Sequence, residues 1–226
     1  MTVSSRGRSP RPSQPIAAER SSVASSSGKR LTVGVLALQG DFAAHERAAA
    51  ALGHRSRLVK TAAHLEGLDA LLLPGGESTT MLKFLQGEGL WQPLADFCRS
   101  GRPVLGTCAG AILLASEVRS PAQASLGVLD IAVERNAYGR QLDSFIATLP
   151  DAPPPFADLT AVFIRAPVIL RTGPGVEVLL RHDGRPILVR QGPVWAATFH
   201  PEMTEDRRVL AEVLRGAEPG PQEPSR

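Results

Sequence analysis

Short apolar runs alternate with longer amphipathic stretches in the first half of the chain. Residues 31–38 are almost continuously apolar and are followed, after Gln39-Gly40-Asp41, by a helical pattern over residues 42–52. A short, nearly unbroken apolar run is typical of a strand that is buried on both faces, as in parallel sheets. The pattern therefore predicts a buried strand and then a helix that packs on the sheet.

The same alternation continues as far as residue 115. Strand patterns recur over residues 57–60, 70–73 and 104–105, and helical patterns over residues 79–85, 93–99 and 111–115. Repeated strand–helix units build a parallel sheet through right-handed crossovers. Ligands bind to such sheets beyond the carboxyl ends of the strands, so we expect the functional residues there.

From residue 128 onward, short strand patterns separated by turn residues replace the helices. Strands are expected over residues 177–180, 187–189 and 194–199, with a turn at His182-Asp183-Gly184-Arg185 between the first two. A last helix is expected over residues 204–214, with Thr204 as its N-cap. We therefore predict a three-layer α/β fold with a mostly parallel central sheet, flanking helices and a short antiparallel section.

Both ends of the chain have the composition of loose tails. Residues 1–30 hold nine Ser, several Pro and Arg, and few apolar side chains, too few to offset the entropy cost of ordering. Residues 216–226 are rich in Pro, Gly and Glu. We therefore expect one folded domain over residues 31–215, a disordered N-terminal tail over residues 1–30 and a loose C-terminal tail over residues 216–226.

The charge and composition exclude several classes of partner. The formal charge of +3 comes from residues 1–30, which carry six basic residues and one acidic residue, whereas residues 31–226 carry 19 basic and 21 acidic residues. A slightly acidic body with 4% aromatic residues does not favour nucleic-acid binding. No apolar run approaches the roughly 20 residues that cross a bilayer, so we expect no membrane partner.

Cysteine usage indicates a reduced setting. Two cysteines are too few for a disulfide framework, and neither lies in a metal-binding pattern. The N-terminal tail lacks the apolar segment of a secretory signal, although its Ser and Arg bias has some likeness to an organellar transit sequence. We therefore expect a cytoplasmic protein without a metal site.

Cys108 lies at the predicted corner between a strand and a helix, in Gly106-Thr107-Cys108-Ala109-Gly110. Gly106 and Gly110 have no Cβ, so the chain can bend tightly there and substrate can approach the backbone. A helix N-terminus next to a thiol favours the reactive thiolate. We predict that Cys108 is a nucleophile, whereas Cys98 lies on an ordinary amphipathic helix and receives no role.

A cysteine nucleophile needs a base, and a third group that orients the base. His200 and Glu202 flank Pro201 directly after the predicted strand 194–199, and an extended backbone at this Pro would place both side chains on one face. We predict that Cys108, His200 and Glu202 form a catalytic triad. A structural role is expected for the other histidines, His45, His54, His64 and His182.

The segment Leu73-Pro74-Gly75-Gly76-Glu77-Ser78 is similar to a phosphate-binding loop but lacks the Lys-Ser/Thr pair of that motif. We interpret it as a turn whose backbone N–H groups, at Gly75 and Gly76, point at a developing oxyanion. The N–H of Ala109, directly after the nucleophile, would be a further donor. The simpler alternative is a strand-to-helix turn capped by Ser78.

Six segments together resemble one family, the glutaminase subunits of pyridoxal 5'-phosphate synthase, which are class I glutamine amidotransferases. They are residues 36–40, 73–81, 106–110, 134–141, 163–167 and 199–202. The resemblance covers about residues 31–214 and implies a flavodoxin-like fold of the class I glutamine amidotransferase type. Met203 departs from the family, which usually has Leu at this position.

The resemblance implies hydrolysis of L-glutamine to glutamate by the triad, without a cofactor. The released ammonia would pass to a separate synthase subunit, whose docking activates the glutaminase; Gln39 and the following helix are candidate contacts. The residues implied to hold glutamine are Gly76, Glu77, Ser78, Arg135, Ile164 and Arg165.

Two other functions stay open at this stage. One is a different thiol hydrolase acting on glutamine or γ-glutamyl substrates, which the segments Arg135-Asn136 and Ile164-Arg165-Ala166-Pro167 disfavour. The other is a noncatalytic subunit that senses glutamine, which the intact set of Cys108, His200 and Glu202 disfavours.

Overall fold

The computed structural model describes residues 29–135 and 144–217. The tails expected over residues 1–30 and 216–226 lie almost entirely outside the described residues, and so do residues 136–141 of the segment 134–141. Within the described ranges, no helix is long and apolar enough to cross a membrane.

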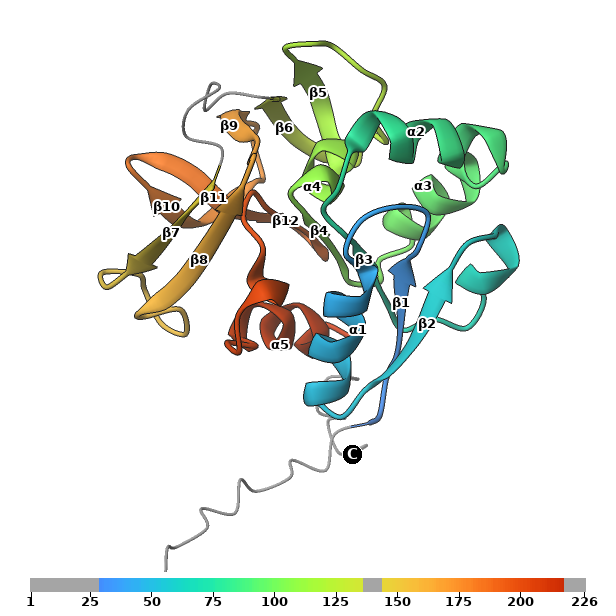
Figure 1. The fold of residues 1–226 in the computed structure, drawn as a ribbon, viewed down its shortest axis with the longest axis horizontal. Helices are drawn as coiled ribbons and strands as arrows, with labels where there is room; N and C mark the ends of the chain where they lie inside the picture. Colours follow the sequence, from blue (N-terminus) through green and yellow to red (C-terminus); the bar gives the residue numbers. More distant parts are fainter. Residues whose placement is uncertain (1–28, 136–143, 218–226) are drawn as a thin grey trace, which may run out of the picture.

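The described residues form a central sheet of seven strands in the order β10-β11-β12-β4-β3-β1-β2 (Figure 1). Five strands run parallel: β1 (Thr32–Leu36), β2 (Arg55–Val59), β3 (Ala70–Leu73), β4 (Val104–Thr107) and β12 (Val194–Ala197). Two antiparallel strands, β11 (Arg185–Gln191) and β10 (Glu177–His182), extend it at one edge. The predicted mostly parallel sheet with a short antiparallel section is confirmed.

Helices cover both faces of the sheet. One face carries α1 (Phe42–Ala51) and α5 (Arg208–Arg215), and the other carries α2 (Ser78–Gly87), α3 (Trp91–Arg99) and α4 (Ala109–Leu114) (Figure 1). Strand β3 shows why: Leu72 packs with the first helix pair, whereas Leu71 and Leu73 pack with the other three helices. Alternate side chains of a strand point to opposite faces, so an unbroken apolar strand supplies both cores.

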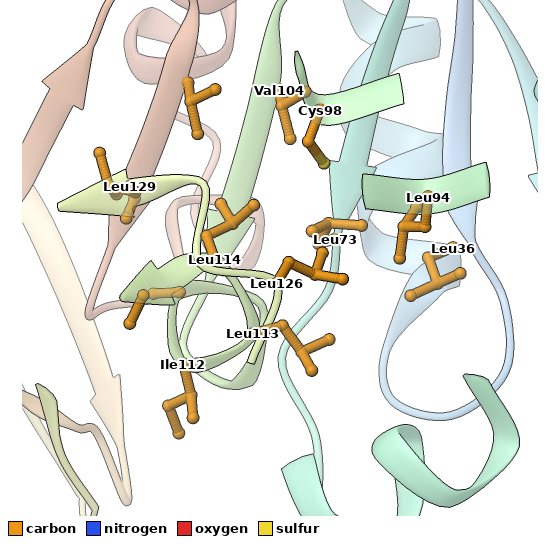
Figure 2. Packing of buried hydrophobic residues seen from close by; sticks show 14 of the residues in the cluster. Leu36, Leu73, Leu94, Cys98, Val104, Ile112, Leu113, Leu114, Leu126 and Leu129 are labelled. Carbon is orange, nitrogen blue, oxygen red and sulfur yellow. The ribbon is translucent and has the colours of Figure 1, made fainter. Parts of the chain in front are cut away.

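Figure 2 shows the larger of the two cores, where Leu73 and Val104 of the sheet meet Leu94 and Cys98 of α3 and Leu113 of α4. Each of these side chains is at most 3% exposed. The expected packing position of Cys98 agrees with this burial.

The chain between β4 and β10 makes a long excursion beyond the central sheet. It forms a three-stranded sheet of β5 (Ala115–Arg119), β6 (Leu129–Glu134) and β9 (Val168–Thr172), and a hairpin of β7 (Ser144–Leu149) and β8 (Leu159–Ile164). The chain returns to the central sheet at β10 and β11, and then adds β12 next to β4.

The boundaries that the sequence predicts lie within two residues of the observed ones, except at the start of the last helix, and one strand is not separated in the prediction from the helix before it. The last helix begins at Arg208 instead of Thr204, because Pro201–Met203 form a short 3-10 turn and the backbone of Thr204 is extended. The Thr204 hydroxyl does not cap the helix; it accepts the N–H of Asp206 at 3.2 Å. The helix after Cys108 ends at Leu114 and runs directly into β5, a strand that the apolar pattern did not separate from it.

Candidate active site

The register between β4 and β12 brings the predicted nucleophile and base together. Thr107 and Ala197 are paired at the ends of these parallel strands, and the N–H of Cys108 donates to the carbonyl of Ala197 at 2.9 Å. His200 follows three residues later, where its N–H donates to the carbonyl of Val162 at 2.8 Å. Both side chains therefore reach the carboxyl edge of the sheet, and both line one cavity.

Cys108 adopts a strained backbone conformation at its corner, with φ 47° and ψ −103°. The neighbouring glycines let α4 pack tightly here: a Cβ on Gly110 would lie 2.0 Å from the carbonyl oxygen of Leu73, and one on Gly106 would lie 2.6 Å from the backbone of Gly110. The thiol donates to the carbonyl of Ile164 at 3.7 Å. Strain of this kind concentrates at functional sites, where the surrounding structure maintains it.

His200 is 7% exposed, and its Nδ1 lies 2.8 Å from Oε1 of Glu202. The backbone at this pair is a 3-10 turn from Pro201 to Met203, not the extended segment that the sequence suggested, yet the imidazole and the carboxylate still meet. Because a carboxylate only accepts, Nδ1 carries the hydrogen and Nε2 is left for the thiol. Nε2 is buried without a hydrogen-bond partner of normal geometry among the described residues.

The electrostatics of this pair favour the charged forms. Burial alone would lower the pKa of His200, but hydrogen bonding to Cys108 and Glu202 raises it well above its usual value. Burial would raise the pKa of Glu202, but the charge of His45 and hydrogen bonds from His200 and His45 hold it below its usual value. A histidine that stays protonated beside a thiol favours the thiolate.

His45 is the residue near this pair that sequence reasoning missed. It was expected to be structural, and it is 1% exposed, but its Nε2 lies 3.4 Å from Oε1 of Glu202 and 3.1 Å from Oγ1 of Thr107. Only the approach of α1 to the turn after β12 makes this contact, so no local motif could have indicated it.

A cavity of about 250 Å³ opens in front of Cys108 and His200. This volume lies just below the range of about 300–1,000 Å³ that is usual for drug-sized ligands, so the cavity suits a small metabolite. Its walls include every residue that the resemblance assigns to glutamine: Gly76, Glu77, Ser78, Arg135, Ile164 and Arg165. Four further residues line the cavity although the sequence predicts no role for them in the site: Asp41, Ile112, Pro167 and Met203.

Glu77 and Arg135 form the charged wall of the cavity. Glu77 caps α2 by accepting the N–H groups of Thr79 and Thr80 at 3.1 and 2.6 Å, a role that the simpler sequence interpretation gave to Ser78. Hydrogen bonds with Thr80 are the main reason that the pKa of Glu77 is lowered to about 2. Arg135 donates to the hydroxyl of Thr79 at 3.1 Å and lies 3.6 Å from the Glu77 carboxylate.

The glycine turn between β3 and α2 lies against the catalytic pair on one side and the loop before α1 on the other. A Cβ on Gly75 would approach Cε1 of His200 to 2.3 Å, and a Cβ on Gly40 would approach the carbonyl oxygen of Gly75 to 1.8 Å. Oε1 of Gln39 accepts the N–H of Glu77 at 2.7 Å. Gln39 therefore holds the glycine turn in its present conformation.

A thiol at a strand-to-helix corner, facing a buried histidine–carboxylate pair at the end of the next parallel strand, can perform acyl transfer by nucleophilic catalysis. Together with the seven-stranded α/β sheet, this arrangement defines the class of the protein as a class I glutamine amidotransferase. A solved structure described as a glutamine amidotransferase matches it with a TM-score of 0.77 and 49% identity, over 82% of this chain and 98% of that chain. A glutamine amidotransferase from Thermotoga maritima shares the fold, with a TM-score of 0.54 and 17% identity over 84% of this chain and 95% of that chain.

The sequence comparison narrows the class to a family. Residues 35–216 match the SNO glutamine amidotransferase family. Two relatives are named pyridoxal 5'-phosphate synthase subunit PdxT. The Solibacter usitatus protein is 54% identical, over 78% of this chain and 94% of its own length. The Deinococcus radiodurans protein is 53% identical, over 79% of this chain and 93% of its own length. The chain belongs to the SNO glutamine amidotransferase family.

Proposed function

We propose that this chain is the glutaminase subunit of a pyridoxal 5'-phosphate synthase and acts in the cytoplasm. In this proposal residues 31–215 are the glutaminase domain, which hydrolyses L-glutamine and passes the ammonia to a synthase subunit. The names of the relatives that are 54% and 53% identical support the assignment. The observation that carries it is the pairing of β4 with β12, which places Cys108 beside His200 with Glu202 behind the histidine.

In the proposed first half-reaction, the Cys108 thiol gives its proton to Nε2 of His200, and the sulfur attacks the side-chain amide carbon of glutamine. The carbon–nitrogen bond then breaks, and His200 returns a proton to the nitrogen, which leaves as ammonia. Glu202, 2.8 Å from Nδ1, keeps the ring in the required tautomer and stabilises its charged form. The product on the protein is a glutamyl thioester.

In the second half-reaction, a water molecule gives a proton to His200 and attacks the thioester carbonyl carbon. The carbon–sulfur bond breaks, glutamate leaves, and His200 returns the proton to the sulfur, which restores the Cys108 thiol. Each proton that His200 accepts is therefore returned within the cycle.

Charge complementarity supports glutamine as the substrate of the cavity. A free amino acid presents a carboxylate and an ammonium group, and the cavity wall offers the guanidinium groups of Arg135 and Arg165, the Glu77 carboxylate and the carbonyl of Ile164. Arg135 is 13% exposed and already oriented by Thr79, so pairing with a substrate carboxylate costs little further ordering. Gly76 and Ser78 would contact the substrate from the turn.

The oxyanion of each tetrahedral intermediate needs donors near Cys108. We assign this role to the backbone N–H groups of Gly75, Gly76 and Ala109. Gln39 and Gly40 hold the turn that carries the two glycines. Docking of the synthase subunit near Gln39 would therefore be able to reorient the turn and activate hydrolysis.

The test is glutamate release from L-glutamine by the purified chain, alone and with its cognate synthase subunit. Cys108→Ala should abolish release, whereas the matched variant Cys98→Ala should retain at least about half of the wild-type rate, because Cys98 lies in the core of α3 away from the cavity. Docking of both variants to the synthase is compared by sedimentation.

The outcomes separate the alternatives. Turnover that rises with the synthase and disappears in Cys108→Ala supports the proposed function. Turnover retained in Cys108→Ala would reject the nucleophile assignment, and glutamine binding without turnover by the wild-type complex would favour a sensing subunit. Hydrolysis of γ-glutamyl peptides in preference to glutamine would favour a different thiol hydrolase.

A further inference from the structure

We propose that His45 is a positioning residue of the active site: its Nε2–H holds the Glu202 carboxylate in the place from which Glu202 orients His200. The proposal rests on the proposed function, because it adds a fourth member to the Cys108, His200 and Glu202 set. His45 does not touch the cavity in front of Cys108, so it would act only through Glu202 and Thr107.

The contacts place His45 between the two halves of the site. Its Nε2 is 3.1 Å from the hydroxyl of Thr107, the residue directly before the nucleophile, and 3.4 Å from Oε1 of Glu202. Oε1 is the same oxygen that lies 2.8 Å from Nδ1 of His200. One ring nitrogen therefore contacts both the strand end that carries the thiol and the carboxylate that orients the base.

Among the described residues, Glu202 has few hydrogen-bond donors around its carboxylate, so each contact with it matters. Its other oxygen, Oε2, is buried without a hydrogen-bond partner in the described part of the chain, so both histidines contact the carboxylate through Oε1. Because a carboxylate has no hydrogen to donate, the favourable tautomer of His45 has its hydrogen on Nε2. Without the His45 donor, His200 would be the one side chain in the described part of the chain that hydrogen-bonds the Glu202 carboxylate. A buried carboxylate with so few donors is unfavourable in a low-dielectric site.

Solvent has little room to replace His45. The void beside Glu202 holds about 10 Å³ and is lined by His45, Ala48, Leu105, Pro201, Glu202, Asp206, Arg207 and Leu210. A buried water needs about 10–15 Å³, so the void is at the lower limit for a single molecule. Besides the two histidines, the ionisable groups on this side of Glu202 are Asp206 and Arg207. The terminal nitrogens of Arg207 are engaged with Glu205 and the carbonyl of Thr204, and its Nε is buried without a hydrogen-bond partner among the described residues.

The position of His45 on α1 also connects the site to the glycine turn. The loop that leads into α1 contains Gln39, which accepts the N–H of Glu77, and Gly40, which packs on the carbonyl of Gly75. Asp41 then caps α1 by accepting the N–H of Ala44, next to His45. A shift of α1 would therefore move the glycine turn and the Glu202 carboxylate together.

The test compares His45→Asn with His45→Gln in the complex of the chain with its synthase subunit. The Gln amide reaches the position of Nε2 and can still donate to Glu202, whereas the shorter Asn amide cannot. We expect His45→Asn to lower kcat for glutamine hydrolysis by about 10–100-fold with KM changed less than about 2-fold, and His45→Gln to recover at least about half of that loss on a logarithmic scale.

The pH profile provides a readout that a purely structural role would not change. His45 contributes to the low pKa of Glu202, so without its donor the pKa of Glu202 rises. The low-pH limb of kcat should therefore move to higher pH in His45→Asn and should move less in His45→Gln. Melting temperatures of both variants are measured alongside.

The kcat values and pH profiles of the two variants decide whether His45 positions Glu202. A kcat for His45→Asn within about 3-fold of wild type, or equal losses in both variants with an unmoved low-pH limb, overturns the proposal. If His45→Asn fails to fold, His45→Leu removes the Nε2 donor and keeps an apolar side chain of similar size in the buried site. A loss of kcat with the same direction of pH shift then supports the role, and no change overturns it.

A failure of the proposed function itself would be seen separately. It appears as absence of glutamate release by the wild-type complex. The pH dependence of Cys108 alkylation by iodoacetamide, followed by peptide mass spectrometry, then still tests His45 because it requires no turnover. An upward shift of its low-pH limb in His45→Asn supports the positioning role, and an unchanged limb overturns it.

Discussion

The two cysteines of this chain show how surroundings decide the chemistry of a thiol. Cys98 is 2% exposed in the apolar core, and burial raises its pKa to about 12, so it remains a thiol at any physiological pH. Cys108 has nearly the same exposure, 6%, but lines a cavity beside His200. Burial alone therefore does not distinguish an inert cysteine from a candidate nucleophile, whereas an adjacent base does.

Glu202→Gln tests the orienting carboxylate and has a defined pH signature. Replacing the anion by an amide should lower kcat by roughly 10²–10⁴-fold, because His200 loses the partner that fixes its tautomer and charge. In the wild type, the pKa of Glu202 is lower in the folded chain than its usual value of 4.5. Its contribution to stability is therefore fully present above about pH 4.5 and is lost as the pH falls toward the folded-state pKa.

Urea unfolding of both proteins between pH 3 and pH 7 measures this contribution. The free energy of unfolding of the wild type, minus that of Glu202→Gln, should be constant near neutral pH and should shrink below about pH 4.5. A difference that grows on acidification would contradict an ionised Glu202 in the folded state.

Sequence could indicate some of these residues and not others. The glycine-flanked corner predicts Cys108, and the spacing around a proline predicts His200 with Glu202. His45 carries no such signal, because its partners Thr107 and Glu202 come from other elements far along the chain. When tertiary packing alone brings a side chain to its partners, no local sequence motif predicts the contact.

At the scale of elements, the glycine turn between β3 and α2 packs closely against His200 of the active site. Gly75→Ala should lower kcat by about 100-fold or more, because the added Cβ would lie 2.3 Å from Cε1 of His200 and would displace the imidazole. The backbone of Gly75 has no positive φ, so the substitution tests the steric contact and not backbone strain.

Gly87→Ala at the other end of α2 is the matched control. A Cβ there meets nothing within 4 Å, so activity should be unchanged and the helix should be stabilised by about 0.5–1 kcal/mol. Steady-state kinetics and urea unfolding of the two variants give the comparison. A Gly75→Ala protein with near wild-type kcat would show that the turn moves away from His200 during catalysis.

The elements most predictable from sequence are those whose apolar pattern matches their burial. Strands β1, β3 and β4 are buried along nearly all of their length. Strand β3 is an unbroken apolar run, whereas in β1 a Gly interrupts the apolar residues and in β4 Gly and Thr follow an apolar pair. The boundary between α4 and β5 escapes prediction, because the apolar residues 111–115 run across it without a turn residue. The predicted start of α5 is wrong, because the 3-10 turn after His200 delays the helix by four residues.

At the scale of the whole molecule, the proposed domain of residues 31–215 leads to a prediction about the ends. A chain trimmed to residues 29–217 should keep its melting temperature within about 3 °C and its rate of glutamate release. The start of β1 is secured within the trimmed chain, because Asp69 pairs with Lys29 at 2.7 Å and accepts the N–H of Thr32 at 2.8 Å.

Differential scanning calorimetry and the coupled assay with the synthase subunit compare the trimmed and full chains. Loss of hydrolysis at an unchanged melting temperature would show that a removed segment takes part in function. A large drop in melting temperature would show that the domain boundary is misplaced.

The pairing of β12 with β4 has a consequence for how such a protein can evolve. The proposed nucleophile and base are held by adjacent strands of the central sheet. Arg135, Ile164 and Arg165 belong to the excursion that leaves the central sheet after β4 and returns to it at β10. Lengthening a flexible loop costs only about 0.6 kcal/mol for each doubling. Insertions and deletions in that excursion can therefore change which amide is accepted while selection preserves the reaction, so substrate choice and chemistry can diverge at different rates in one gene.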